Sequence, residues 1–186
     1  MTSASGQRTT EESADQLTAH LIALVRNHQY GDLAQLRRSG VKTTAHIRAG
    51  WSAPNEQDRD IYEQVAFLFA LYHRGVGHPT RGYGSLGTAA RRIGSRTDPK
   101  HRGPGDPGAA RLVDRIVASR RIPWRHLQHS IARLRSCEQQ PPSWTQLAVD
   151  LSQWNDRKAR IAYNWAVDFH APYTNARKTT QKGSST

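Results

Sequence analysis

The sequence predicts an all-α protein, a single-domain bundle of about seven to eight helices. Apolar residues recur every three or four positions along most of the chain, and glycine, proline or a capping residue separates successive runs. The two-residue alternation of strands is absent over any useful length. With 186 residues, 36% of them hydrophobic, and with five Trp and six Tyr, the chain can close one core.

Three short helical patterns occupy the first fifty residues. Ser13 is the expected N-cap of the first helix, and Gly31 is expected to end it. Asp32 then caps a short helix over residues 33–39, and a weaker helical pattern covers residues 42–49. These segments predict a compact helical start to the bundle.

A long central helix is predicted from residue 58 to residue 72. Val65, Leu68 and their neighbours make this segment apolar on all sides. A helix without a polar face is buried, so we expect it to lie at the centre of the fold. Gly75 and Gly77 are expected to end it.

Further helices are predicted in the rest of the chain. Ser85 caps a helix that reaches Ile93, and residues 94–108 form a Gly- and Pro-rich, cationic loop that we expect to be mobile. The later helices begin at Asp106 with Pro107, at Pro123, at Ser143 and near Ile161. Their expected inward side chains are Leu127, Ile131, Leu134, Trp154, Trp165 and Phe169, which makes the last two tryptophans core residues rather than platforms for bases.

Residues 13–173 are therefore expected to form one helical domain, with residues 1–12 and 174–186 as disordered ends. The polar start of the chain lacks the apolar segment of a secretory signal. The longest apolar run of the whole sequence, residues 65–72, is far shorter than the roughly 20 residues of a membrane span. The single Cys137 can form neither an intramolecular disulfide nor a thiolate metal site. We expect a cytoplasmic protein without a membrane partner.

Positive charge is concentrated in the second half of the sequence. The chain has 27 Lys and Arg against 15 Asp and Glu, a net charge of +12. The charges of residues 1–80 cancel, so the whole excess lies beyond them. An excess of cations favours a polyanionic partner, nucleic acid before an anionic membrane surface. The alternative is an arginine-rich surface that is merely solvated.

Paired and regularly spaced arginines are the candidate nucleic-acid contacts. Pairs close three of the predicted helices, and a stripe four residues apart lies opposite the apolar face of the helix after Pro123. One stripe alone is typical of a solvated face, but several helix ends with outward cations favour a phosphate-binding surface. The pairs are Arg37 and Arg38, Arg91 and Arg92, and Arg120 and Arg121, and the stripe is Arg125, His129 and Arg133.

The motifs of enzymes are missing or lack their context. Residues 82–87 match G-x-G-x-x-G, but a helix and a loop precede them where a dinucleotide site needs a strand. His126 and His129 lie three apart without a carboxylate at ligand spacing. No nucleophile motif or acid/base pair is recognisable. We therefore expect a non-catalytic protein that needs no metal and no cofactor.

Several short motifs follow one another in a recognisable order. They are residues 31–38 (GDLAQLRR), 69–72 (FALY) and 84–92 (GSLGTAARR), and then Trp144, Asp150, Trp154, Trp165, Asp168 and Phe169. In this order they resemble the CasB family, the small subunit of the type I-E CRISPR surveillance complex Cascade, from about residue 15 to residue 170. The loop of residues 94–108 and the tail after residue 173 depart from the family pattern.

The resemblance implies a non-enzymatic helical subunit, present as two copies in a guide-RNA complex. Its implied partners are the crRNA, the target and displaced (non-target) DNA strands, the backbone and large subunits of Cascade and a second copy of itself, and its role is to stabilise the R-loop. It carries over Arg37 and Arg38 as phosphate contacts, followed by Arg91, Arg92, Arg120, Arg121, Arg133 and Arg160.

The leading alternative is a stand-alone helical DNA-binding regulator of the helix-turn-helix type. Such a regulator reads bases through a recognition helix and prefers one duplex sequence. A subunit of a guide-RNA complex needs only attraction to the nucleic-acid backbone, because base pairing with the guide reads the sequence.

Overall fold

The computed structural model describes residues 9–171 and confirms the all-α prediction. Within these residues there are nine α-helices and two 3-10 turns, and no strand beyond one isolated bridge between Gly94 and Arg102. The weak pattern over residues 42–49 is a true helix, which brings the number of helices to nine rather than seven or eight. The helices are α1 (Thr10–Arg26), α2 (Tyr30–Leu36), α3 (Thr44–Gly50), α4 (Arg59–Tyr72), α5 (Leu86–Ala90), α6 (Pro107–Val117), α7 (Trp124–Ser136), α8 (Trp144–Ser152) and α9 (Ile161–His170).

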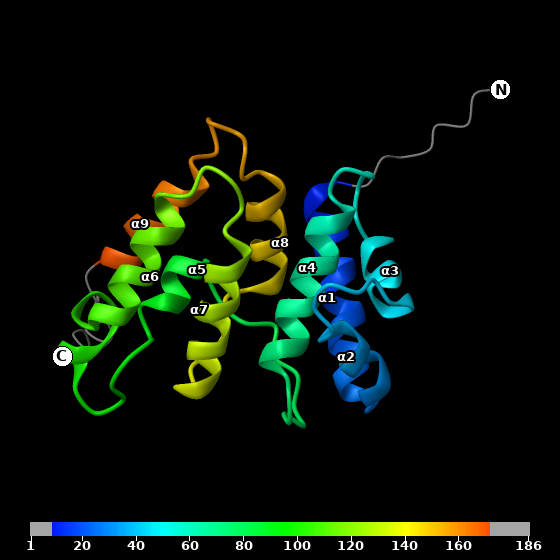
Figure 1. Ribbon diagram of the computed structural model, residues 1–186, viewed down its shortest axis with the longest axis horizontal. Helices are drawn as coiled ribbons and strands as arrows, with labels where there is room; N and C mark the ends of the chain where they lie inside the picture. Colours follow the sequence, from blue (N-terminus) through cyan, green and yellow to red (C-terminus); the bar gives the residue numbers. More distant parts are fainter. Residues whose placement is uncertain (1–8, 172–186) are drawn as a thin grey trace, which may run out of the picture.

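The helices form two groups that meet at α4 and α8 (Figure 1). Helices α1 to α4 lie on one side of the molecule, and α5, α6, α7 and α9 lie on the other. Helix α8 packs against α1 and α4, while α4 also packs against α7. No helix of residues 9–171 is long and apolar enough to cross a membrane.

Helix α4 is the buried centre that its sequence predicts. It packs against α1, α2, α3, α7 and α8. Val65, Leu68 and Phe69 are almost completely inaccessible to solvent, and even Glu63 is buried. A helix surrounded in this way contributes apolar surface to both groups of helices.

The start of the chain differs from the prediction at three boundaries. Helix α1 begins at Thr10, because Thr9 and Glu12 form a capping box, and Ser13 is a buried residue inside the helix instead of its cap. The helix ends at Arg26, where His28 takes a positive φ of 55° in place of the expected glycine. Gly31 and Asp32 consequently lie within the first turn of α2. Residues 10–12, which were expected to belong to a disordered end, are part of α1. Residues 1–8 and 174–186 of the expected disordered ends lie outside the described residues.

The predicted caps of the later helices are correct. Ser85 accepts a hydrogen bond from the Thr88 amide, and Ser143 caps α8 in the same way. Asp106 caps α6 through the Ala109 amide, with Pro107 as the first helical residue. Helix α5 ends at Ala90, before its predicted end at Ile93.

The cationic loop of residues 94–108 contains its own hydrogen-bonded structure. Two 3-10 turns, Pro99–His101 and Gly103–Gly105, occupy its middle. The Arg102 guanidinium donates to the carbonyls of Ser95 (2.8 Å) and Arg96 (2.7 Å) across the loop. One cation of the loop thus stabilises the loop itself, while the expected mobility stays a prediction.

The predicted core tryptophans of the last helices pack together. The ring centroids of Trp154 and Trp165 lie 5.3 Å apart; Trp165 is buried as expected, whereas Trp154, just after α8, is half-buried and packs against the core. The Trp165 indole N–H donates to Asp150 over 2.6 Å. Burial raises the pKa of this aspartate to about 6, against the opposing effect of the indole hydrogen bond.

An aromatic cluster at the end of α4 holds the connection to α5. His73 is buried and stacks on Phe69 with 3.9 Å between the ring centroids. Its Nε2 accepts the amide proton of Thr80 (3.1 Å), so Nδ1 carries the ring proton and donates to the Phe69 carbonyl (2.9 Å). The indole N–H of Trp144 donates to the Thr80 carbonyl over 3.1 Å. Both backbone groups of Thr80 are thereby bound by buried side chains of α4 and α8.

The pKa of His73 predicts a loss of stability in acid. Burial lowers this pKa from 6.5 to about 4, so the neutral imidazole contributes fully above pH 6.5 and its contribution falls as the pH drops toward 4. The raised pKa of Asp150 acts in the opposite direction over an overlapping range. We therefore compare wild type with His73→Gln, because the Asp150 effect cancels in the difference.

The unfolding free energy of wild type minus that of His73→Gln should decrease by up to about 3 kcal/mol as the pH is lowered from 7 to 4. Urea denaturation at five or more pH values measures it. A difference that stays constant with pH would show that His73 does not have the predicted neutral, buried state.

Candidate nucleic-acid interface

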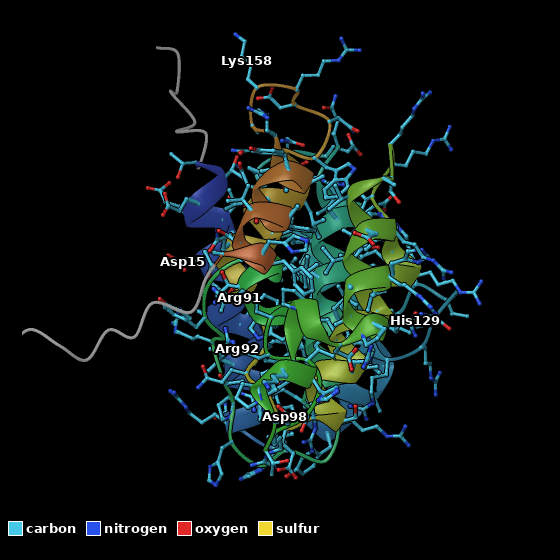
Figure 2. The ribbon with its side chains drawn as sticks, turned by 90° about the vertical axis from the view of Figure 1, so that its left-hand side faces the viewer. Asp15, Arg91, Arg92, Asp98, His129 and Lys158 are labelled. Atoms are coloured by element: carbon cyan, nitrogen blue, oxygen red, sulfur yellow. The ribbon has the colours of Figure 1, made fainter. Side chains whose placement is uncertain are left out.

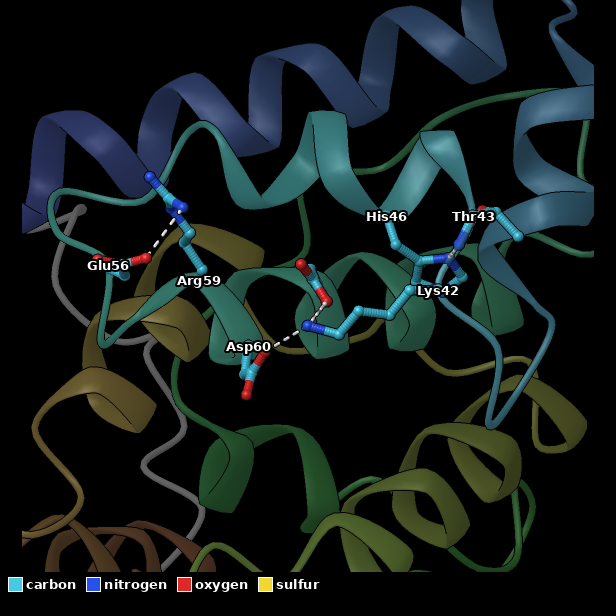
Figure 3. Close-up of polar contacts among 7 residues, drawn as sticks. Lys42, Thr43, His46, Glu56, Arg59 and Asp60 are labelled. Atoms are coloured by element: carbon cyan, nitrogen blue, oxygen red, sulfur yellow. Dashed lines mark hydrogen bonds and ion pairs between the residues drawn. The ribbon is translucent and has the colours of Figure 1, made fainter.

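Ion pairs neutralise many of the cations around α1 to α4. Lys42 Nζ lies 2.7 Å from Asp60 Oδ1, and Arg59 Nη1 lies 3.4 Å from Glu56 Oε1 (Figure 3). Within residues 9–171 the Lys and Arg side chains that form ion pairs are Lys42, Arg48, Arg59, Arg81, Arg96 and Arg133. Four of these six cations, Lys42, Arg48, Arg59 and Arg81, form their ion pairs with acidic residues from the first 63 positions.

The exposed arginines between residues 111 and 125 have no such partners. None of them forms an ion pair with any residue in the range 9–171. They lie on α6, on the connection that follows it, and at the start of α7. These unpaired residues are Arg111, Arg115, Arg120, Arg121 and Arg125.

Helix periodicity places one face of α6 along a groove. Gly108, Arg111, Leu112 and Arg115 follow one another at spacings of three, one and three residues, so they lie on one side of the helix. The opposite side, with Ala109, Val113 and Ile116, is buried, and α6 packs against α9 and α7. The groove-facing arginines therefore project from a helix whose other face is anchored in the core.

Helix α7 supplies the other wall of the groove. His129, Ala132 and Arg133 share one face at spacings of three and one, opposite the buried Leu127, Ile131 and Leu134. We call the depression between the two helices the α6–α7 groove. It has a volume of about 450 Å³, and its lining residues are Gly108, Arg111, Leu112, Arg115, His129, Ala132 and Arg133.

The predicted stripe of α7 is divided by the structure. His129 and Arg133 line the groove, whereas Arg125 is exposed near the start of the helix and does not line it. Arg133 is half-buried, and its Nη2 donates to Asp106 Oδ1 over 3.0 Å. Arg133 is thus partly neutralised and links α7 to the N-cap of α6.

The paired arginines of the sequence fall into different surroundings. Arg120 and Arg121 follow α6, which ends at Val117, so they lie in the connection rather than in the helix, where both are exposed. Arg91 and Arg92 follow α5 and are half-buried. The guanidinium of Arg92 donates to the Tyr83 carbonyl over 3.2 Å.

Arg91 and Arg92 lie apart from His129, which lines the groove. In Figure 2 His129 lies on the right-hand side of the molecule, while Arg91 and Arg92 lie left of its centre. The structure therefore does not bring all the predicted contacts into one patch. Arg120, Arg121 and Arg125 continue the sequence from α6 to α7, whereas Arg91 and Arg92 belong to another part of the surface.

Arg37 and Arg38 form a second cationic region at the end of α2. Arg38 is exposed, while Arg37 is half-buried and has its pKa lowered by burial and by the nearby positive charge of Arg74. Arg135 is near the same end of α4, since its charge acts on both Tyr72 and His73. This region therefore lies around the C-terminal end of α4.

Arg160 has a structural environment of its own. It precedes α9 with a left-handed φ of 49°, and its guanidinium lies 4.0 Å from the centroid of the Tyr163 ring. The cation–π contact fixes the side chain on its own helix. Arg160 is exposed but is not part of the α6–α7 groove.

The G-x-G-x-x-G segment is a packing element. A Cβ on Gly82 would lie 1.9 Å from the Pro142 carbonyl oxygen, and a Cβ on Gly87 would lie 2.0 Å from that of Trp165. Ser85 caps the short helix α5 and donates a hydrogen bond to Asp168. The glycines thus permit close backbone contacts, and a carboxylate occupies the place where a phosphate would approach.

Metal-ligand side chains are not clustered in the described part of the chain. No group of three or more His, Cys, Asp or Glu side chains within residues 9–171 could hold an ion.

Arg111 and Arg115 of the groove were not among the residues predicted from the sequence. Their spacing of four residues, behind the Asp106 cap, is the signal that could have identified them.

Comparisons with known proteins agree on one family and one fold. The family described as CRISPR-associated protein Cse2 matches residues 32–170. The fold is similar to the crystal structure of CasB from Thermobifida fusca, with a TM-score of 0.67 and 21% sequence identity, covering 87% of this chain and 98% of that chain. No curated protein matches the chain significantly.

The double role of Asp106 predicts different effects for two substitutions. Asp106→Ala removes both the cap of α6 and the partner of Arg133, and should lower the free energy of unfolding by about 1–2 kcal/mol. Asp106→Asn keeps a capping oxygen and should cost clearly less. Urea denaturation of both variants measures the difference, and equal losses would mean that the ion pair, not the cap, stabilises this corner.

Proposed function

The chain belongs to the family of CRISPR-associated protein Cse2, and from this premise we propose that it is the non-catalytic small subunit of a type I-E Cascade complex. In this role it binds the target and displaced DNA strands and the crRNA backbone without sequence preference, and it stabilises the R-loop. Its protein partners are the backbone and large subunits and a second copy of itself. The complex acts in the cytoplasm.

The observation that carries the proposal is the set of unpaired arginines between the start of α6 and the start of α7, two of which, Arg111 and Arg115, line the α6–α7 groove. Five exposed guanidinium groups within fifteen residues create a local field that attracts phosphates. The guide RNA reads the sequence by base pairing, so a subunit that contacts the nucleic-acid backbone needs no base-reading helix. The family membership supplies the assembly, and the arginines supply a surface suited to it.

Sequence-independent binding is the first expected result. The isolated protein should bind scrambled and unscrambled duplexes with similar affinity, because phosphate attraction does not depend on base sequence. The logarithm of the binding constant should fall with log salt by about 0.7–0.9 per phosphate neutralised. Fluorescence anisotropy at several salt concentrations measures both quantities. A preference above about a hundredfold for one duplex would support the helix-turn-helix regulator instead.

Charge reversal should separate the two cationic regions. In a reconstituted complex, Arg111→Glu with Arg115→Glu should weaken target-duplex binding at least about tenfold and reduce the salt slope by about 1.4–1.8. Arg37→Glu with Arg38→Glu should also weaken target retention, by a smaller factor, because Arg37 is half-buried.

The matched control is Arg157→Glu with Lys158→Glu, which changes the charge equally on the exposed connection between α8 and α9. It should change affinity by less than about threefold. Thermal melts of the free subunits establish that all variants fold. If the three double variants lose affinity equally, net charge rather than a defined surface determines binding.

A further inference from the structure

The α6–α7 groove combines two kinds of surface that serve different parts of a nucleotide. Leu112 and Ala132 supply apolar atoms, and at Gly108 the guanidinium of Arg133 lies where a side chain would begin, with Nη1 2.5 Å from the position of a Cβ. Arg111 and Arg115 stand on the α6 wall. A surface that only attracts phosphates needs cations and gains nothing from an apolar hollow between them.

The groove is large enough to admit a nucleobase, and its walls carry surfaces on which a base can pack. Its volume of about 450 Å³ is within the range of small-molecule sites, roughly 300–1,000 Å³. Arg133 extends from α7 to the start of α6, where its hydrogen bond to Asp106 holds the guanidinium as a fixed polar plane at one end of the groove. Guanidinium planes and apolar side chains are surfaces on which unstacked bases pack.

The neighbouring cations suit a strand that continues past the groove. Arg111 and Arg115 are exposed and form no ion pair within residues 9–171, so they can meet the phosphates on either side of an inserted base. A duplex keeps its bases paired and stacked, and can offer only its backbone to this surface. The apolar atoms of the groove are useful only to a strand whose bases are free.

We propose that the α6–α7 groove receives one unstacked base of a single nucleic-acid strand, with Arg111 and Arg115 on its flanking phosphates. This inference rests on the proposed function and specifies the form of nucleic acid that this surface selects. The strand is recognised by the presence of a base, not by its identity, because the groove offers packing surface and charge.

Strands with and without bases provide the direct test. The full-length protein is titrated by fluorescence anisotropy with a short oligothymidylate and with a strand of abasic units of the same length and charge. The abasic strand should bind at least about fivefold more weakly, since packing of one base contributes roughly 1–3 kcal/mol. Equal affinity for the two strands overturns the proposal.

A variant that fills the groove locates the effect. Ala132→Leu adds apolar volume at an exposed helix position and leaves the charge unchanged, so it should remove the preference for the strand with bases while keeping the salt slope. The matched control is Ala34→Leu, an exposed alanine of α2, which should keep the preference. A preference that survives Ala132→Leu places the base elsewhere and overturns the proposal.

The cationic surface and the base site can be tested separately. Arg111→Glu with Arg115→Glu should weaken binding of both strands, which tests the cationic surface of the proposed function. If that loss occurs while the abasic strand binds as well as oligothymidylate, the surface binds phosphates only and the base site is wrong. If neither strand responds to the charge reversal, the proposed interface itself is wrong.

Discussion

The arrangement of the two helix groups depends on the hydrogen bonds that fix Thr80. Its amide donates to His73 of the α4 end, and its carbonyl accepts from Trp144 of α8. Buried backbone groups without partners are costly, so these two bonds determine where the connection after α4 passes. Gly82, at a φ of +73°, then allows the connection to touch the segment before α8. The start of α5, and with it the second group of helices, is positioned by this cluster.

The fold also determines which positive charges remain available. Near α2, α3 and the start of α4, the acids of the first 63 residues meet cations such as Lys42 and Arg48. Exposed ion pairs of this kind contribute little to stability, but they decide the sign of the surface. Around α6 and α7 acids are scarce, and Asp106 is used to hold Arg133. The unpaired arginines from α6 to the start of α7 therefore create a positive field on that part of the molecule.

The same packing that builds the core orients the proposed interface. Helix α6 buries Ala109, Val113 and Ile116, and this fixes its rotation about its own axis. Leu127 and Ile131 do the same for α7. Two helices with fixed rotations leave a constant space between their outer faces, so the side chains along it belong to a preformed groove. Preformed geometry reduces the entropy lost on binding.

The sequence by itself determined the helices, most of their caps and the central place of α4, because spacing of three and four residues and capping by Ser85, Asp106 and Ser143 are local properties of the chain. It also predicted cationic binding, since charge can be counted. It did not determine which arginines act together. Arg91 and Arg92 have the same pattern as Arg120 and Arg121, yet the structure turns the first pair toward the protein. The groove between α6 and α7 was decided only by the tertiary structure, because it exists only where residues from two helices meet.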